Sequence, residues 1–487
     1  MNYNLQNIFY LCTQMNKKQK RYHMKRNIII AALLAMTLQA AHAQTETTEA
    51  PQPVQKSYIY RLYLTDKNGT AKINKPEKFL SPKALNRRAK QLLAIDSTDL
   101  PVSPQYVKKI AKQAQVVGTS RWLNTVVVKV NDTTVIDRLV ALDFVSRAHR
   151  VWTSPRNEEK MPTRKEFATT FPSKDSTENI YGKGFHQIHV MGGDSLHAEG
   201  FRGQGMTIAV IDGGFCNADS IPSIQEINIL GTRDFVAEPR PNIYVDTSHG
   251  TGVLSCMGLN VPHFFVGTAP EASFWLLRSE DGRTEQEVEE DYWVMAAEFA
   301  DSVGVDVINT SLGYNNFDDG ITSHKYRDLD GHTAHISRAA SMLADKGIVL
   351  VCSAGNSGDE PWKKITPPAD ADNVITVGAL NRKLINANFS SLGPSQDGRV
   401  KPDIMAIGNP SYLMYGEGEI IRANGTSFSS PTACGMVACL WQALPHLTAR
   451  ELIEVVRQSG DRYDAPDNVY GYGLPNFWHA YINNLTR

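Results

Sequence analysis

The sequence predicts an α/β fold in which a parallel β-sheet is covered by helices on both faces and is preceded by a small α+β unit. Beyond residue 181, short apolar runs alternate with longer stretches of helical spacing, which is typical of strands buried on both faces. Before residue 153, alternating apolar runs are mixed with short helical stretches, which indicates the α+β unit. The length of 487 residues favours two or three domains.

The composition is that of an ordinary soluble globular protein. Hydrophobic residues make up 42% of the chain and charged residues 21%, so there is enough apolar material for a core and global disorder is excluded. Lys+Arg number 50 and Asp+Glu 51, which leaves a formal net charge of -1. Because this balance gives no basic footprint, we expect no nucleic-acid partner.

The first 43 residues have the pattern of a cleaved secretory signal. Basic residues between positions 17 and 26 precede a short apolar run at 28–38, and Ala41-His42-Ala43 places small residues before Gln44. A membrane anchor would need about 20 apolar residues, which is more than this run offers. We therefore expect a signal peptide over 1–43, no membrane anchor, and a secreted or periplasmic protein.

Residues 57–152 are expected to form the α+β unit. Ser81 is suited to cap a helix because its hydroxyl accepts a backbone N–H, and Pro82 fits the first helical position. Residues 153–180 are expected to be an exposed linker, since 153–177 is polar and holds three prolines. We expect maturation to cleave in this linker. The unit's strands are expected at 57–64, 123–130 and 144–151, and its helices at 81–93, 104–113 and 135–142.

Residues 181–487 are expected to form the larger domain. In parallel sheets of this kind, reactive groups gather just beyond the carboxyl ends of the strands. The strands are expected at 206–211, 273–277, 305–309, 348–352 and 374–378, and the helices at 249–257, 285–303, 333–346, 427–444 and 448–459.

Three polar residues stand where a reactive group is expected. Asp212 ends the first strand, His249 lies in Ser248-His249-Gly250-Thr251-Gly252, and Ser427 lies in the segment 424–431. Each has a structural alternative when taken alone. Asp212 could be a turn aspartate, His249 a structural residue in a helix capped by Ser248, and Ser427 an N-cap. Glycines beside His249 let another backbone segment approach closely.

The three residue types together fit nucleophilic catalysis. A serine hydroxyl needs an adjacent base, a histidine takes its proton and returns it to the leaving group, and a buried carboxylate fixes the histidine tautomer. Asn356 follows a strand in Ser353-Ala354-Gly355-Asn356 and offers a side-chain NH₂ to the developing oxyanion. Its alternative is an ordinary turn asparagine in the left-handed conformation.

These segments resemble the subtilisin-like serine proteases, the subtilase family. The resemblance rests on the order of aspartate, histidine and serine, on segments 248–253 and 424–431, and on 389–394 with 401–404. It implies that the residues with catalytic roles are Asp212, His249, Ser427 and, as the oxyanion donor, Asn356.

The resemblance also implies a substrate site and a zymogen. Ser311-Leu312-Gly313 matches the segment that pairs with substrate backbone, so the partners would be polypeptides. Residues 57–152 resemble the ferredoxin-like propeptide, which assists folding and then inhibits the enzyme until it is cleaved. Gly213 stands where the family usually has Ser or Thr, which implies the loss of one hydrogen bond that supports the aspartate.

Other enzyme classes fit the sequence less well. An esterase or lipase would normally show G-x-S-x-G, which is absent, and no histidine is followed by glutamate, which excludes the zinc-protease motif H-E-x-x-H. A catalytically inactive subtilase-like binding protein is the remaining alternative, and the filled triad positions oppose it. We expect a secreted serine endopeptidase that acts through an acyl-enzyme intermediate.

The chemistry requires no cofactor, whereas structural calcium stays open. Asp246 and the pair Asp318-Asp319 are either calcium ligands or solvated loop carboxylates. Free thiols are expected because no C-x-x-C pair occurs, with a disulfide between Cys216 and Cys256 as the alternative. The cysteines beyond the signal are Cys216, Cys256, Cys352, Cys434 and Cys439.

Overall fold

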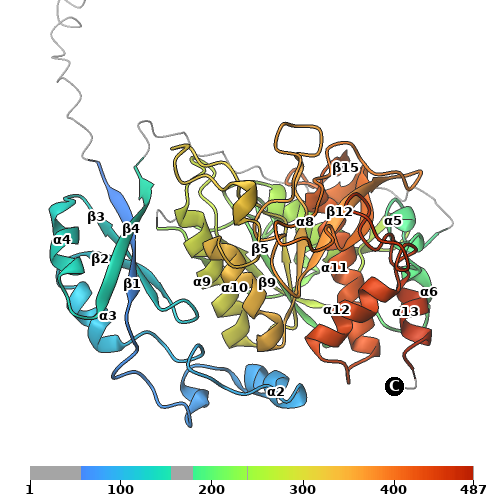
Figure 1. Cartoon of the computed structure of the whole chain (residues 1–487). Helices are drawn as coiled ribbons and strands as arrows, with labels where there is room; N and C mark the ends of the chain where they lie inside the picture. Colours follow the sequence, from blue (N-terminus) through green and yellow to red (C-terminus); the bar gives the residue numbers. More distant parts are fainter. Residues whose placement is uncertain (1–55, 155–178, 238–239, 486–487) are drawn as a thin grey trace, which may run out of the picture. The chain divides into compact units, whose positions relative to one another are not determined.

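The structure is a computed structural model that describes residues 56–154, 179–237 and 240–485. Figure 1 shows its helices and strands in sequence colours. The expected signal peptide at 1–43 and most of the expected linker, 155–178, lie outside the described residues.

The N-terminal unit is a four-stranded antiparallel sheet with the strand order β2-β3-β1-β4. Helices follow the first strand and precede the last, which is the βαββαβ arrangement of a ferredoxin-like unit and confirms the expected fold. The strands are β1 (Tyr58–Leu64), β2 (Gln115–Ser120), β3 (Thr125–Val130) and β4 (Val145–Thr153), and the helices are α2 (Pro82–Lys90), α3 (Pro104–Ile110) and α4 (Thr134–Val140).

Local signals explain which elements of this unit were predicted. The Ser81 hydroxyl accepts the Ala84 N–H at 3.2 Å, so the expected cap of α2 is confirmed. Strand β2 was missed because its pairing with β3 shifts register between Val116 and Gly118. A bulge of this kind breaks the alternation of apolar and polar residues on which a strand prediction depends.

The larger domain is built on a seven-stranded sheet with the order β13-β12-β11-β10-β5-β9-β6, in which the neighbouring strands run parallel. The expected parallel sheet is therefore confirmed, although the two edge strands β6 and β13 were not predicted. The strands are β5 (Thr207–Asp212), β6 (Asn228–Asp234), β9 (Ser273–Arg278), β10 (Val307–Thr310), β11 (Val349–Ser353), β12 (Ile375–Asn381) and β13 (Ile404–Asn409).

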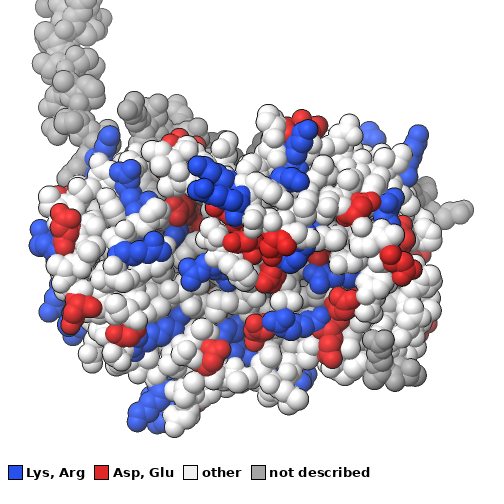
Figure 2. All heavy atoms as spheres, viewed as in Figure 1, with Lys and Arg blue, Asp and Glu red and all other residues white. Residues whose placement is uncertain are grey.

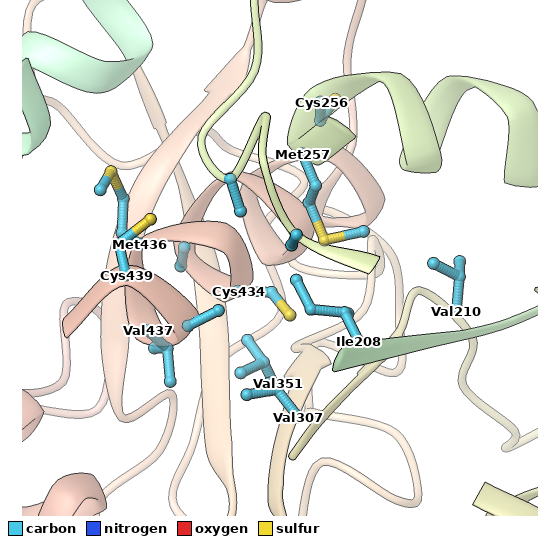
Figure 3. Close-up of a cluster of buried hydrophobic side chains, with 14 of the residues drawn as sticks. Ile208, Val210, Cys256, Met257, Val307, Val351, Cys434, Met436, Val437 and Cys439 are labelled. Carbon is cyan, nitrogen blue, oxygen red and sulfur yellow. The ribbon is translucent and has the colours of Figure 1, made fainter. Parts of the chain in front are cut away.

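Helices cover both faces of this sheet (Figure 1). On β5, Ile208 and Val210 pack into the core with α8 and α11, whereas Ala209 and Ile211 pack into the core with α9 and α10. Figure 3 shows the first of these cores, where Ile208 lies close to Cys434 of α11 and Met257 of α8. The helices are α8 (His249–Gly258), α9 (Val288–Val303), α10 (His335–Met342), α11 (Thr426–Ala443) and α12 (Ala449–Gln458).

The cysteines of the larger domain are free thiols. Cys256, Cys352, Cys434 and Cys439 are buried, and Cys216 is half-buried. This confirms the expected free thiols, and the alternative disulfide between Cys216 and Cys256 is not formed.

Basic and acidic side chains are interspersed on the face that Figure 2 shows. None of the described helices combines the length and the apolar character needed to cross a lipid bilayer.

Candidate active site

The candidate residues meet at the carboxyl edge of the parallel sheet. Asp212 is the last residue of β5, Ser311 follows the adjacent strand β10, and Asn356 lies three residues beyond β11. These residues line one pocket together with His249, Leu312, Gly313 and Ser427. The sequence-predicted residues are therefore brought together at the edge where a parallel sheet collects reactive groups.

Asp212 and His249 form a hydrogen-bonded pair. The Nδ1 atom of His249 lies 2.9 Å from Oδ1 and 3.0 Å from Oδ2 of Asp212, whose side chain is fully buried. Burial lowers the pKa of His249, but the charge of Asp212 and its hydrogen bond raise this pKa more, so it lies above its ordinary value. The pair is thus arranged to stabilise a protonated imidazole.

The local sequence explains how His249 reaches Asp212. Helix α8 begins at His249, and the Thr247 hydroxyl accepts the His249 N–H at 3.2 Å. Ser248 occupies the predicted N-cap position, but its hydroxyl makes no capping bond, and the neighbouring Thr247 hydroxyl accepts the first N–H of the helix instead. A Cβ atom on Gly250 would lie 2.4 Å from the Gly214 carbonyl oxygen. This confirms the prediction that a glycine beside His249 admits another backbone segment.

Ser427 is the second residue of α11, and Gly425 occupies the N-cap position instead of it. Its hydroxyl donates to the Ser311 carbonyl at 3.3 Å, and the Ser311 hydroxyl donates to the Ser427 carbonyl at 2.8 Å. Among the described residues, no hydrogen bond joins Ser427 to His249. Such bonds in serine hydrolases often shorten only when substrate binds. The first N–H groups of a helix have no intrahelical acceptor and favour negative charge.

Asn356 is fixed by Thr426. The Asn356 Oδ1 atom accepts hydrogen bonds from the Thr426 N–H and hydroxyl, both at 2.9 Å. With this oxygen engaged, the amide nitrogen is the atom that remains to donate into the pocket. The left-handed residue of this turn is Gly355, with φ of 106°, so the alternative of a left-handed turn asparagine does not describe Asn356. Sequence reasoning missed the positioning role of Thr426, although it lies inside the segment 424–431.

Sequence reasoning also missed Glu280, which lines the same pocket. Glu280 stands two residues beyond β9, so the rule that found Asp212 at the end of β5 applies to it as well. Its Oε1 atom accepts the Tyr314 hydroxyl at 2.7 Å. Burial and then repulsion from Asp212 raise the pKa of Glu280 to about 7, although the bond from Tyr314 acts in the opposite direction.

Glu280 occupies space that a larger residue at position 213 would need. A Cβ atom on Gly213 would lie 3.3 Å from Oε2 of Glu280 and 3.2 Å from Cγ2 of Thr247. The Gly213 N–H donates to Oδ1 of Asp212 at 2.8 Å. This backbone bond supports the aspartate at a position that has no side-chain hydroxyl.

The carboxylates suggested as calcium ligands are engaged within the protein. Asp246 pairs with Arg278 at 2.8 Å and with Arg240 at 3.1 Å. Asp318 accepts the Glu285 N–H, and Asp319 accepts the N–H groups of a following turn. Within the described ranges, no group of three or more His, Cys, Asp and Glu side chains could hold a metal ion. These carboxylates are therefore engaged in bonds within the protein, and structural calcium stays an open expectation.

Two family profiles and several relatives match the chain. The profile of the Subtilase family matches residues 203–473, and that of the Bacteroidota peptidase S8 propeptide domain matches residues 47–166. Subtilisin DY of Bacillus licheniformis is 29% identical over 298 residues, covering 59% of this chain and 95% of the relative. The subtilisin of Bacillus pumilus is 30% identical over 286 residues, covering 58% and 93%.

One solved structure supports the fold alone. The crystal structure of MycP1 from the ESX-1 type VII secretion system superposes with a TM-score of 0.50 at 21% sequence identity, covering 67% of this chain and 90% of that one. The family profile, by contrast, spans more than half of the chain. The chain therefore belongs to the subtilase family: it is a serine endopeptidase that carries its own propeptide domain and is autoprocessed.

Proposed function

We propose that this protein hydrolyses peptide bonds with a triad of Asp212, His249 and Ser427 through an acyl-enzyme intermediate. The observation that carries the proposal is the buried pair of Asp212 and His249 in one pocket with Ser427 and Asn356. Ser427 attacks the substrate carbonyl while His249 takes its proton. His249 then returns this proton to the leaving amine, and Asp212 holds the imidazole tautomer throughout.

Negative charge develops on the carbonyl oxygen during this attack. The amide nitrogen of Asn356 is proposed to donate to it, and the bonds that hold the Asn356 oxygen to Thr426 support this role. The N-terminus of α11 adds a favourable dipole at the same point. Water then attacks the acyl-enzyme with His249 again as the base, which restores Ser427.

The substrate backbone is proposed to lie along Ser311-Leu312-Gly313. This segment follows β10 directly and lines the pocket, so an extended peptide can pair with it as an additional strand. All proton transfers are served by the protein's own side chains, and we therefore propose that the reaction needs no cofactor. Peptide hydrolysis that is unchanged after treatment with a chelator supports this proposal, and a loss that added metal restores contradicts it.

The chain is proposed to be organised as a signal peptide over 1–43, a propeptide over 57–152, a linker over 153–180 and a peptidase domain over 181–487. The signal pattern supports a secreted or periplasmic location, and the propeptide is proposed to inhibit until the linker is cut. N-terminal sequencing of the secreted protein tests this: a mature end within 153–177 agrees with the proposal, and an end at Gln44 alone contradicts it.

The experiment that tests the proposed function compares the wild-type precursor with Ser427→Ala. The wild type is expected to process itself and to cleave peptides, whereas Ser427→Ala stays at precursor length and shows no peptide hydrolysis. Near-normal processing and hydrolysis by Ser427→Ala would overturn the triad. A folded wild type that neither processes nor cleaves would favour the alternative of an inactive binding protein.

A further inference from the structure

Three glutamates stand together on one side of the proposed catalytic pocket, and we call Glu280, Glu285 and Glu289 the glutamate wall. Glu280 and Glu285 line the pocket itself, and Glu285 is exposed at its rim. Glu289 lies behind them at the start of α9, and its Oε1 atom accepts the Asp281 N–H at 2.9 Å. Its Oε2 atom is buried and has no hydrogen-bond partner among the described residues.

No lysine, arginine or histidine of the described chain forms an ion pair with any of the wall's three carboxyl groups, although the charges of His249 and Arg278 act on Glu280 and lower its pKa. The neighbouring acids do have such partners, because Asp246 pairs with Arg278 and Asp281 pairs with Arg283. Carboxyl groups that are buried without a cation resist ionisation. In agreement, burial and repulsion from Asp212 raise the pKa of Glu280 to about 7.

The wall adjoins the proposed path of the substrate. Tyr314, which comes directly after Ser311-Leu312-Gly313, donates its hydroxyl to Glu280. The Asp318 N–H donates to the Glu285 carbonyl at 2.8 Å, which joins the two loops a second time. A peptide that pairs with Ser311-Leu312-Gly313 on the acyl side of the scissile bond therefore presents side chains to Glu280 and Glu285.

We propose that the glutamate wall is a specificity subsite for a lysine or arginine side chain on the acyl side of the scissile bond. This inference rests on the proposed function, because it assigns part of the same pocket. A long basic side chain places its charge against Glu280 while its aliphatic stem passes the rim at Glu285.

The test uses matched peptides that differ at a single residue. Lysine, arginine, norleucine, glutamine and glutamate are placed in turn at each of the four positions before the scissile bond. The ratio of kcat/KM for the basic peptide to that for the norleucine peptide is measured for the wild type. This ratio does not depend on the fraction of active enzyme, and it cancels changes that affect all substrates equally.

Three variants accompany the wild type. Glu280→Gln keeps an oxygen that can accept the Tyr314 hydroxyl and removes the charge. Glu285→Gln removes the charge at the exposed rim, where a loss of folding is not expected. Glu199→Gln is the matched control, because it removes the same charge from an exposed residue at the end of α6 (Gly193–Ala198), which does not line the pocket.

At one position, the wild type is expected to prefer the basic side chain by roughly 10- to 100-fold, the range typical of a charge-assisted hydrogen bond. Glu280→Gln is expected to remove most of this preference, Glu285→Gln a smaller part, and Glu199→Gln none. If Glu280→Gln does not fold, the reduced preference of Glu285→Gln carries the test.

Two results would overturn the subsite while leaving the proposed function intact. The first is active cleavage without a basic preference at any position, and the second is a preference that Glu280→Gln and Glu285→Gln leave unchanged. Calcium binding that is lost in Glu280→Gln would identify the wall as a metal site and would also overturn the proposal. Failure of the wild type to cleave every peptide would instead count against the proposed function.

Discussion

Helix α9 carries buried acids in two regions that differ in how their charge is balanced. Toward the N-terminal unit, Asp291 and Asp301 receive arginines from that unit: Arg61 lies 2.7 Å from Asp291, and Arg121 lies 2.6 Å from Asp301. Toward the proposed catalytic pocket, Glu289 and its neighbours in the glutamate wall form no ion pair with a cation among the described residues. The propeptide therefore neutralises one acidic region of the peptidase and leaves the other for a substrate.

The contrast extends to hydrogen bonds. Both oxygens of Glu298, farther along α9, accept bonds from the N-terminal unit, from the Ser120 hydroxyl at 2.5 Å and from the backbone N–H groups of Arg121 at 2.9 Å and Trp122 at 3.0 Å. In Glu289, by comparison, one buried oxygen has no partner within the described residues. The difference teaches that buried carboxylates on one helix differ in whether the fold supplies them with partners, so burial alone does not identify a functional carboxylate.

The largest effect is expected from removing the one pocket carboxylate that is fully engaged by a histidine. Asp212→Asn loses the charge that stabilises the imidazolium and no longer fixes the tautomer of His249. We expect kcat to fall by about 10⁴-fold. Steady-state kinetics on active-site-titrated enzyme measures this loss, with Asp194→Asn as the surface control. A loss of less than tenfold would remove Asp212 from the proposed triad.

The next largest effect is expected on the stability of the folded precursor, when an ion pair between the N-terminal unit and α9 is broken. Arg61→Leu leaves Asp291 buried without its guanidinium, and the loss of one partner of a buried ion pair costs about 3–5 kcal/mol. Denaturant unfolding is measured on the uncleaved precursor carrying Ser427→Ala.

Arg150→Leu is the control for this measurement, since Arg150 lies on the neighbouring strand β4 and is exposed. We expect it to change the free energy of unfolding by less than about 0.5 kcal/mol. Equal effects of the two substitutions would mean that the pair of Arg61 and Asp291 does not hold the propeptide against α9.

A third change concerns the negative charge that the reaction itself creates. Asn356→Leu removes a donor to the oxyanion but no charge, so kcat is expected to fall by roughly 10²–10³-fold while KM changes little. Steady-state kinetics on a single peptide separates the two constants. A near-normal kcat would place oxyanion stabilisation on other donors.

The smallest expected effects are those of pH on stability, and they have opposite signs in the two regions. Burial raises the pKa of Asp291, but the charge of nearby Arg61 lowers it by more, so this pKa falls to about 2. The contribution of Asp291 is therefore complete above the unfolded value of about 3.9 and is lost as pH falls toward 2. The pKa of Glu280 is instead raised to about 7, so its contribution is present at low pH and lost as pH rises through 7.

Glu280→Gln in the Ser427→Ala precursor tests this sign. Relative to its parent, the variant should gain stability between pH 5 and pH 8, as measured by denaturant unfolding at each pH. A gain on going to lower pH would show that Glu280 is stabilised as a carboxylate. The charged and titratable groups around Glu280 that also contribute are Asp212, His249, Arg278, Tyr314, Glu285 and Glu289.

The sequence predicted the parts of the fold that depend on local patterns. Strand β5 is a short continuous apolar run and helix α8 begins within a recognisable segment, and the chemistry of Asp212 and His249 could be inferred because each stands at the end of such an element. Glu280 stands at an equivalent place beyond β9 but was missed, because no motif drew attention to it. Its partner Tyr314 lies 34 residues away along the chain.

Other features could not be predicted because they depend on contacts distant in sequence. Arg61 and Asp291 are separated by 230 residues, and neither lies in a recognisable motif. The cap of α8 involves a choice between adjacent hydroxyls, Thr247 and Ser248, which depends on the backbone angles of the folded turn. Packing in the folded protein determines both the ion pair and the cap, and neither can be inferred from composition or residue spacing.

The measurement that tests the central claim most directly is covalent labelling of the mature enzyme with a fluorophosphonate, followed by mapping of the modified residue. We predict a single adduct on Ser427, which is lost in Ser427→Ala and strongly slowed in Asp212→Asn. An adduct on another serine, or peptide hydrolysis that persists after Ser427 is fully modified, would contradict the account.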